Sequence, residues 1–183
     1  AAAGGAARGT PEFERDLIAA VEEYNVEASI LKVWGSEALW QAADEGVQIH
    51  GGYGFVEEYP IERTYRDNRV NRIFEGTNEI NRLLVPGTLM KRAAKGAFPL
   101  LELAGRAMRA LEAGELPALG TGRLARERRL AELNKMLWGY AVGAAGKALG
   151  PAIGDEQGVM AALADVAIEA FAVDSAVARA LQA

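Results

Sequence analysis

Residues 25–52 read NVEASILKVWGSEALWQAADEGVQIHGG, and this stretch decides the fold class. Its apolar residues recur at steps of three, four or seven, which is typical of a long α-helix with one apolar face. These residues are Val26, Ile30, Val33, Trp40, Ala43 and Val47. Gly51 and Gly52 favour the end of this helix, because glycine adopts the left-handed turn of a C-cap without strain. Glu37 lies in the apolar stripe, so it needs a cationic partner if it is buried.

The rest of the chain also shows helical periods separated by turn residues. Thr10 before Pro11 and Thr77 further on are predicted N-caps, and Asn25 is a candidate cap for the long helix. Further helices are expected from residue 60, from residue 77 and near 100–111, 123–148 and 156–181, with loops at 52–59, 74–77 and 114–122. No stretch alternates with period two between turns. The predicted fold is therefore all-α, an antiparallel helical bundle followed by a second helical bundle.

Composition and charge exclude several classes of protein. The chain has 183 residues, of which 50% are hydrophobic and 25% charged, so it is too apolar for a disordered protein. Its net charge of −5 argues against a nucleic-acid partner. The absence of cysteine excludes disulfides and thiolate sites, and a single histidine excludes a multi-histidine centre, so no metal site is expected. We find no membrane-span pattern and no signal peptide, and we expect a soluble, cytoplasmic protein.

The ends of the chain and a change in composition suggest its organisation. Residues 1–9 read AAAGGAARG and lack an apolar period, so a linker or disordered segment is expected there. After residue 96 the composition shifts towards Ala, Leu and Arg, which suggests one helical domain at 10–96 and another at 97–183. The first residue is not Met, and the last residues keep a helical pattern with no stop signal. We therefore expect a piece of a longer polypeptide, with its second domain truncated.

Glu75 is a candidate for chemistry because it lies in a predicted break between helices, between Phe74 and Gly76. Partial desolvation would raise the pKa of its carboxyl group, which suits a general base acting on a weakly acidic C–H. Gly76 would let a substrate pass close to the backbone. The simpler interpretation of the spacing is a first-turn glutamate that interacts favourably with the helix dipole.

Other conspicuous residues have simpler structural interpretations. The glycines at 51–54 lack the preceding strand of a dinucleotide-binding turn, so a helix C-cap is the simpler interpretation. His50 has no Ser or Cys nucleophile nearby and is expected to be a bystander. The arginines at 63–72 alternate with acidic residues, which favours an ion-pair network. The arginines at 123–129 are interpreted as a solvated helix face, with a membrane-surface patch as the alternative.

Three motifs nevertheless occur in a fixed order, and together they are far more specific than any one of them. They are QIHGGYGF at 48–55, EYPIER at 58–63 and RIFEGTNEI at 72–80. This arrangement strongly resembles the C-terminal helical domain of the acyl-CoA dehydrogenases, FAD-dependent enzymes of fatty-acid β-oxidation. The resemblance covers about 25–94. The helices at 97–183 resemble, more loosely, the C-terminal extension of the very-long-chain type.

The resemblance implies roles for individual residues. Glu75 matches the catalytic base, which removes the α-proton of a long-chain acyl-CoA thioester while a hydride leaves the β-carbon for the flavin, giving a trans-2-enoyl-CoA. Gly76 matches a substrate contact. The residues that match FAD contacts are Gln48, Ile49, His50, Gly51, Gly52, Thr77, Asn78 and Glu79, and the first stretch of them faces the FAD of a neighbouring subunit. The implied electron acceptor is an electron-transferring flavoprotein.

The same residues are compatible with two alternatives. An acyl-CoA oxidase shares the flavin chemistry but passes its electrons to oxygen, and a non-catalytic helical oligomerisation module could descend from such an enzyme. The broad apolar arc of residues 25–90 predicts a homodimer or homotetramer. The chain by itself is expected to be inactive, because the flavin-binding domains of the family have no counterpart in it. The arginines at 123–129 are the residues expected to make any weak contact with a membrane surface.

Overall fold

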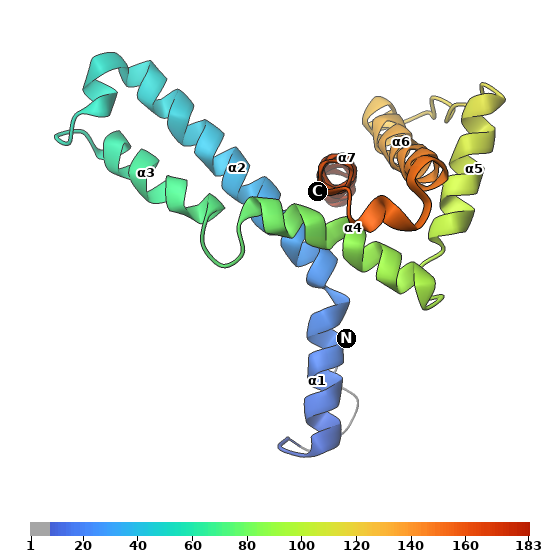
Figure 1. Cartoon of the computed structure of the whole chain (residues 1–183). Helices are drawn as coiled ribbons and strands as arrows, with labels where there is room; N and C mark the ends of the chain where they lie inside the picture. The colour runs from blue at the N-terminus through green and yellow to red at the C-terminus, as the bar shows by residue number, and fades with distance from the viewer. Residues whose placement is uncertain (1–7) are drawn as a thin grey trace.

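The computed structural model describes residues 8–183, and these residues form helices and short turns with no strand among them (Figure 1). The all-α prediction is confirmed. The elements are α1 (Pro11–Glu23), α2 (Asn25–His50), η1 (Gly51–Phe55), α3 (Pro60–Arg69), η2 (Val70–Arg72), α4 (Asn78–Ala94), α5 (Leu100–Glu112), α6 (Ala125–Leu149), η3 (Gly150–Gly154) and α7 (Gln157–Gln182). The linker expected at 1–9 falls mostly on residues 1–7, which lie outside the described residues.

Capping side chains mark two helix starts as predicted. The Thr10 hydroxyl accepts a hydrogen bond from the Phe13 N–H at 3.3 Å, and the Thr77 hydroxyl accepts one from the Ile80 N–H at 3.2 Å. Each bond satisfies a backbone donor that the first turn leaves without a helical partner. Asn25 does not cap α2: it is the first helical residue, and Tyr24 stands at the cap position without a side-chain capping bond.

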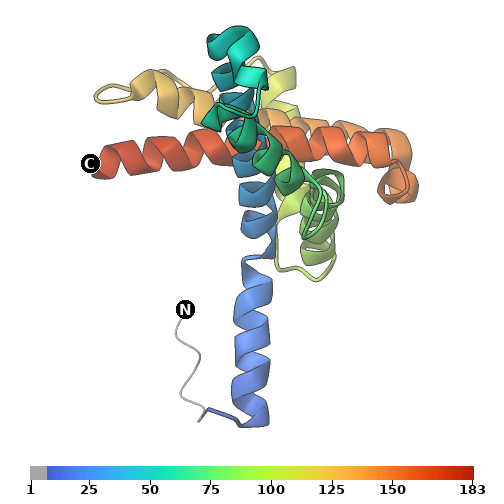
Figure 2. The same cartoon turned by 90° about the vertical axis from the view of Figure 1, so that its left-hand side faces the viewer.

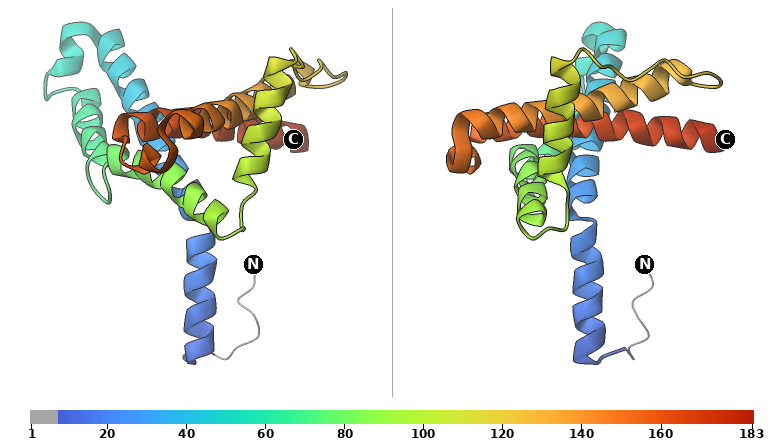
Figure 3. Two further views of the ribbon diagram at one scale, coloured as in Figure 1. Left: turned by 45° about the vertical axis from the view of Figure 1, so that its right-hand side comes forward. Right: turned by 90° about the vertical axis from the view of Figure 1, so that its right-hand side faces the viewer.

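The helices form two groups that meet at α7. In the first group α3 folds back along α2 to form an arm, α4 crosses α2, and α1 extends away from the rest of the chain (Figure 1). In the second group α5, α6 and α7 pack on one another, with α6 and α7 running side by side (Figure 3). The α7 helix also crosses α2 (Figure 2).

The two groups share a hydrophobic core because α7 contributes to both parts of it. One cluster joins α2, α4 and α7 through Val26, Ile30, Val33, Val85, Ala164 and Ile168. A second cluster joins α5, α6 and α7 through Leu100, Trp138, Val142 and Leu163. The indole N–H of Trp138 donates to the Leu163 carbonyl at 3.1 Å, so this buried donor is satisfied. The segments 10–96 and 97–183 are thus held together by shared packing.

The apolar stripe of α2 is buried near the α7 crossing and opens towards the end of the arm. Val26, Ile30, Val33 and Ala43 are buried. Trp34 and Leu39, at other angles around the same helix, are 45% and 46% exposed. None of the helices in the described part of the chain is both long enough and apolar enough to cross a membrane.

Candidate active site

Glu75 lies in the turn between η2 and α4, with a backbone φ of +53°. Gly76 follows with φ +84°, and Thr77 caps α4 next. Glu75 therefore precedes the helix cap by two residues and is not a first-turn glutamate, which rules out the simpler interpretation of its spacing. Its side chain is exposed and Phe74 beside it is 45% exposed. The described residues leave Glu75 exposed, so they do not by themselves supply the desolvation expected of a base.

Asn81 fastens this turn to the helix that follows. Its side-chain amide Nδ2 donates to the Gly76 carbonyl at 2.9 Å and to the Thr77 carbonyl at 3.1 Å. A Cβ placed on Gly76 would lie 3.0 Å from the same Nδ2. Glycine is thus favoured at position 76 by its positive φ, and a Cβ there would crowd the Asn81 amide. Sequence reasoning missed Asn81, because nothing in its spacing distinguishes it from a surface residue of α4.

Asn78, the first residue of α4, has a side chain that is completely buried. Its Oδ1 accepts from Lys32 Nζ at 2.6 Å, and its Nδ2 donates to Ser36 Oγ at 3.0 Å and to Glu37 Oε1 at 3.0 Å. All three partners belong to α2. The side chain predicted to contact FAD is therefore engaged within the chain, where it ties the start of α4 to α2.

Glu37 has the cationic partner that its place in the apolar stripe demanded. Arg82 donates to both carboxylate oxygens, from Nη1 at 2.7 Å and from Nη2 at 2.8 Å, in a bidentate pair. Arg72 Nη2 lies 3.7 Å from Glu37 Oε1. The hydrogen bonds from Arg82 and Asn78 hold the pKa of the Glu37 carboxyl below its usual range, against the opposing effect of burial. The hydrogen bonds of Arg82 to Glu37 and to Asp165 raise the pKa of the Arg82 guanidinium.

Two other charged groups near the start of α4 have shifted pKa values. Burial lowers the pKa of Lys32, while the negative charges of nearby Glu79, Glu37 and Glu75 act in the opposite direction. The pKa of Glu79 is lowered, chiefly by its own backbone N–H and then by the Thr77 hydroxyl. Both donors favour the ionised carboxylate, so Glu79 keeps its negative charge turned to the helix start.

The glycine turn after α2 presents exposed backbone. Gln48, Ile49, His50, Gly51 and Gly52 are all exposed, and Gly51 has φ +59°. No heavy atom lies within 4 Å of a Cβ built at Gly51 or at Gly52, so the space above both is open. The ring atom Nδ1 of His50 lies 2.8 Å from the Gly46 carbonyl oxygen, a contact within its own helix.

A cleft of about 360 Å³ lies beside this turn, between the end of α2, η1 and α3. Its lining residues are Val47, Gly54, Phe55, Glu62, Tyr65, Arg66 and Arg69. Arg66 pairs with Glu62 at 2.6 Å, and the guanidinium of Arg69 lies 5.7 Å from the ring centroid of Trp40. The ion-pair network expected of the arginines at 63–72 is formed only in part: Arg66 pairs with Glu62 and Arg72 approaches Glu37. Arg69 contacts the Trp40 ring instead, and Arg63 forms no ion pair within the described part of the chain. Sequence reasoning did not predict the cleft itself.

The structure keeps the predicted site residues in two separate places. Glu75, Gly76 and the residues 77–79 lie together at the start of α4, whereas residues 48–52 lie at the far end of the arm (Figure 1). The whole of α3 separates them, and a helix rises about 1.5 Å per residue. A cavity of about 640 Å³ lies among α5, α6 and α7, with Ile30 of α2 and Leu89 of α4 also in its wall, and none of the predicted site residues lines it. No group of side chains able to hold a metal ion occurs among the described residues.

Residues 4–90 match the family model described as the C-terminal domain of acyl-CoA dehydrogenases. The chain belongs to the acyl-CoA dehydrogenase family. The probable acyl-CoA dehydrogenase of Bacillus subtilis (strain 168) is 46% identical over 165 residues, which are 90% of this chain and 28% of that protein. The human mitochondrial very long-chain specific acyl-CoA dehydrogenase is 54% identical over 63 residues, which are 34% of this chain and 10% of that protein.

The fold is also that of an acyl-CoA dehydrogenase of known structure. The crystal structure of the acyl-CoA dehydrogenase from Bacillus anthracis complexed with FAD superposes with a TM-score of 0.86 at 43% identity. The match covers 94% of this chain and 30% of that one. The chain thus spans less than a third of the length of these acyl-CoA dehydrogenases, and both helical groups, not only residues 4–90, have a counterpart in the known structure.

Proposed function

We propose that this chain is the C-terminal part of an FAD-dependent acyl-CoA dehydrogenase and that Glu75 is its base. The observation that carries the proposal is the position of Glu75: an exposed carboxylate in a left-handed turn, outside the helix and its cap, in a segment of this family. A carboxylate in such a turn projects from the chain without using its oxygens for capping. It is therefore free to accept a proton from a bound substrate.

In the proposed reaction Glu75 removes the proton from the carbon α to the thioester carbonyl. FAD, when bound, accepts the hydride that leaves the β-carbon. Gly76 is proposed to meet the thioester through its backbone, on the side away from the Asn81 amide. The carboxylate must lie within hydrogen-bond reach of the α-proton, and positioned bases of this kind contribute roughly 10²–10⁴-fold to the rate.

The residues present fit one side of an FAD-binding site, but they do not enclose the cofactor. The open space over Gly51 and Gly52 supports a cofactor lying against bare backbone, with the Gln48 side chain beside it. At the start of α4 the side chains of Thr77, Asn78 and Glu79 are engaged within the chain. The Glu79 N–H already bonds the Glu79 carboxylate, so a contact of FAD with this segment is proposed to use the backbone N–H groups of Thr77 and Asn78.

The glycine turn at residues 48–52 lies far from the turn that carries Glu75, and this separation affects how FAD would contact the chain. Residues 48–52 and Glu75 lie at opposite ends of α3. The two segments of one chain therefore do not contact the same part of one FAD molecule. This separation supports the proposal that the glycine turn serves the FAD of a neighbouring subunit in a homodimer or homotetramer. The chain alone is then expected to be inactive and to hold FAD weakly.

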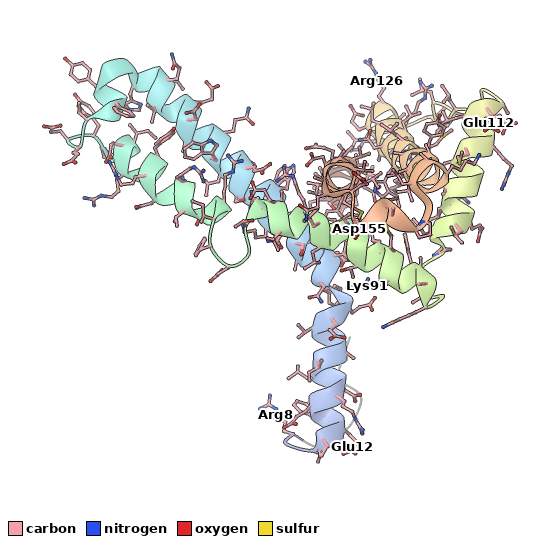
Figure 4. The ribbon with its side chains drawn as sticks, viewed as in Figure 1. Arg8, Glu12, Lys91, Glu112, Arg126 and Asp155 are labelled. Atoms are coloured by element: carbon pink, nitrogen blue, oxygen red, sulfur yellow. The ribbon has the colours of Figure 1, made fainter. Side chains whose placement is uncertain are left out.

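A long-chain acyl-CoA is the proposed substrate, on the strength of the likeness to the human very long-chain specific enzyme. The proposed electron acceptor is an electron-transferring flavoprotein, with an acyl-CoA oxidase as the second candidate within the same flavin chemistry. For weak contact with a membrane surface, Arg126 offers an exposed side chain that projects outward from the start of α6 (Figure 4).

The test uses the longer polypeptide that contains this chain, purified with FAD and given palmitoyl-CoA. The dehydrogenase proposal predicts trans-2-enoyl-CoA and electron transfer to an electron-transferring flavoprotein, with little peroxide in its absence. Rapid peroxide formation in air without that flavoprotein would establish the oxidase instead. A polypeptide that forms no enoyl-CoA with either acceptor would make the chain a non-catalytic helical module.

A further inference from the structure

The turn that carries Glu75 adopts a conformation that few side chains favour. Glu75 has φ +53°, in the left-handed region that residues other than glycine seldom occupy. Such conformations persist only where the surrounding contacts fix them, and they concentrate at functional sites. The contacts that fix this turn are therefore candidates for a role in the chemistry.

The side-chain amide of Asn81 makes direct hydrogen bonds to this turn. Nδ2 donates to the Gly76 carbonyl at 2.9 Å and to the Thr77 carbonyl at 3.1 Å, and these are the first two carbonyls after Glu75. On the other side of Glu75, the Phe74 N–H donates to the Val70 carbonyl at 3.1 Å. The Thr77 hydroxyl also meets the Ile80 N–H of α4, but among the described side chains only that of Asn81 bonds the Gly76 carbonyl next to Glu75.

The helix that bears Asn81 is itself fixed to α2. The fully buried Asn78 side chain bonds to Lys32, Ser36 and Glu37, and Arg82 adds the bidentate pair with Glu37. Asn81 therefore holds the turn against an element with little freedom to move. A change at Asn81 should release the turn without loosening α4.

We propose that Asn81 is a positioning residue for Glu75, holding the turn left-handed so that the carboxylate stands at a fixed point. This inference rests on the proposed role of Glu75 as the base. Proton abstraction depends steeply on the distance from the base to the substrate. Asn81 thus acts mainly on kcat, and on KM only through the neighbouring Gly76.

The conformational part is tested on the 183-residue chain by backbone NMR. Asn81→Leu removes the donor but keeps the size and favours helix, so α4 should remain intact. The matched control is Asn134→Leu in α6, since the Asn134 side chain makes no hydrogen bond within the described part of the chain. We expect the left-handed chemical-shift and coupling signature of Glu75 to be lost in Asn81→Leu alone. Its retention there would overturn the proposal.

The catalytic part is tested in the FAD-loaded longer polypeptide. Asn81→Leu should lower kcat by roughly 10- to 100-fold, the scale expected of a misplaced group, with KM little changed and a larger isotope effect from α-deuterated substrate. Asn81→Gln, which keeps the amide, should restore part of kcat. Normal kcat and isotope effect in Asn81→Leu, with Glu75→Gln inactive, would overturn this proposal alone. An active Glu75→Gln enzyme would overturn the proposed function, and this one with it.

Discussion

Arg82 joins three helices through two carboxylates. From α4 it makes the bidentate pair with Glu37 of α2, and its Nε donates to Asp165 of α7 at 2.7 Å. The Arg82 side chain is 19% exposed and that of Glu37 is 31% exposed, so solvent screens this pair only partly. This network of Arg82, Glu37 and Asp165 lies beside the start of α4. It therefore helps to hold the turn that carries Glu75 in place.

Arg82→Met is expected to destabilise the chain by about 1–3 kcal/mol. This range lies between the cost of breaking an exposed pair and that of breaking a buried one, because Glu37 would keep only Asn78 and the more distant Arg72. Chemical denaturation measures the loss. Arg126→Met, at an exposed arginine of α6, is the control and should change the free energy of unfolding little. If both substitutions lowered the free energy of unfolding equally, the network of Arg82, Glu37 and Asp165 would have no structural role.

The pH dependence of stability tests the same network from the acid side. The pKa of Glu37 is lower in the folded chain than its ordinary value of 4.5. A lowered pKa means that the stabilisation is fully present above the unfolded value and is lost as the pH falls through the folded value. The stability of the wild type relative to Glu37→Gln should therefore shrink as the pH drops below about 4. A difference that stays constant from pH 7 to pH 3 would contradict this assignment.

At the scale of elements, the end of α2 depends on a close backbone approach. A Cβ at Gly54 would lie 2.6 Å from the Val47 carbonyl oxygen and 2.9 Å from His50 Cβ. The chain leaving α2 therefore packs η1 directly against the last turn of the helix. The adjacent cleft, lined by Val47, Gly54 and Arg66, depends on the same approach.

Gly54→Ala should open this turn and destabilise the chain by about 1–3 kcal/mol, the cost expected of overpacking against a backbone atom that cannot yield. Gly52→Ala is the matched control two residues away, since a Cβ there meets nothing within 4 Å. Thermal unfolding of both variants gives the comparison. Equal melting temperatures for the two variants would show that η1 does not need the close approach.

Sequence reasoning predicted elements better than it predicted contacts between them. The helix starts at Thr10 and Thr77 were predictable because capping is a local property. The 3₁₀ turn η1, within what was expected to be a loop, was not predicted, because it depends on the packing of Gly54 against α2. Pro86 lies inside α4, and the helix continues through it although an interior proline favours a kink or a break.

The motifs predicted candidate site residues, but not the contacts that the structure gives to those residues. The need of Glu37 for a cation followed from its place in the stripe, yet its partner Arg82 is 45 residues away in the chain. Period and spacing carry no information on which of the several arginines would reach it. The buried role of Asn78 likewise depends on the crossing of α2 and α4.

For the whole molecule, exposed apolar surface at the two ends of the first group indicates assembly. The α1 helix has no buried residue, and Ile18 and Val21 on it are 58% and 63% exposed. At the end of the arm, Ile49 is 82% and Phe55 75% exposed. Exposed apolar side chains that form a contiguous patch are typical of protein interfaces.

The chain is therefore expected to form a homodimer or homotetramer with symmetric contacts. Light scattering across a dilution series measures the mass. Ile49→Asp should shift the assembly towards monomer, because it places a charge in the interface, whereas Leu101→Asp at another exposed position on α5 should not. A chain that is strictly monomeric at micromolar concentration would contradict the interface assignment.

The most direct test of the central claim is anaerobic reduction of the flavin by acyl-CoA in the Glu75→Gln variant of the longer polypeptide. The amide has the shape of the carboxylate but no basicity, so FAD content should stay normal while the rate of flavin bleaching falls by roughly 10²–10⁴-fold or more. Glu45→Gln, at an exposed residue of α2, should bleach at the wild-type rate. A Glu75→Gln variant that bleaches as fast as the wild type would remove Glu75 from the reaction.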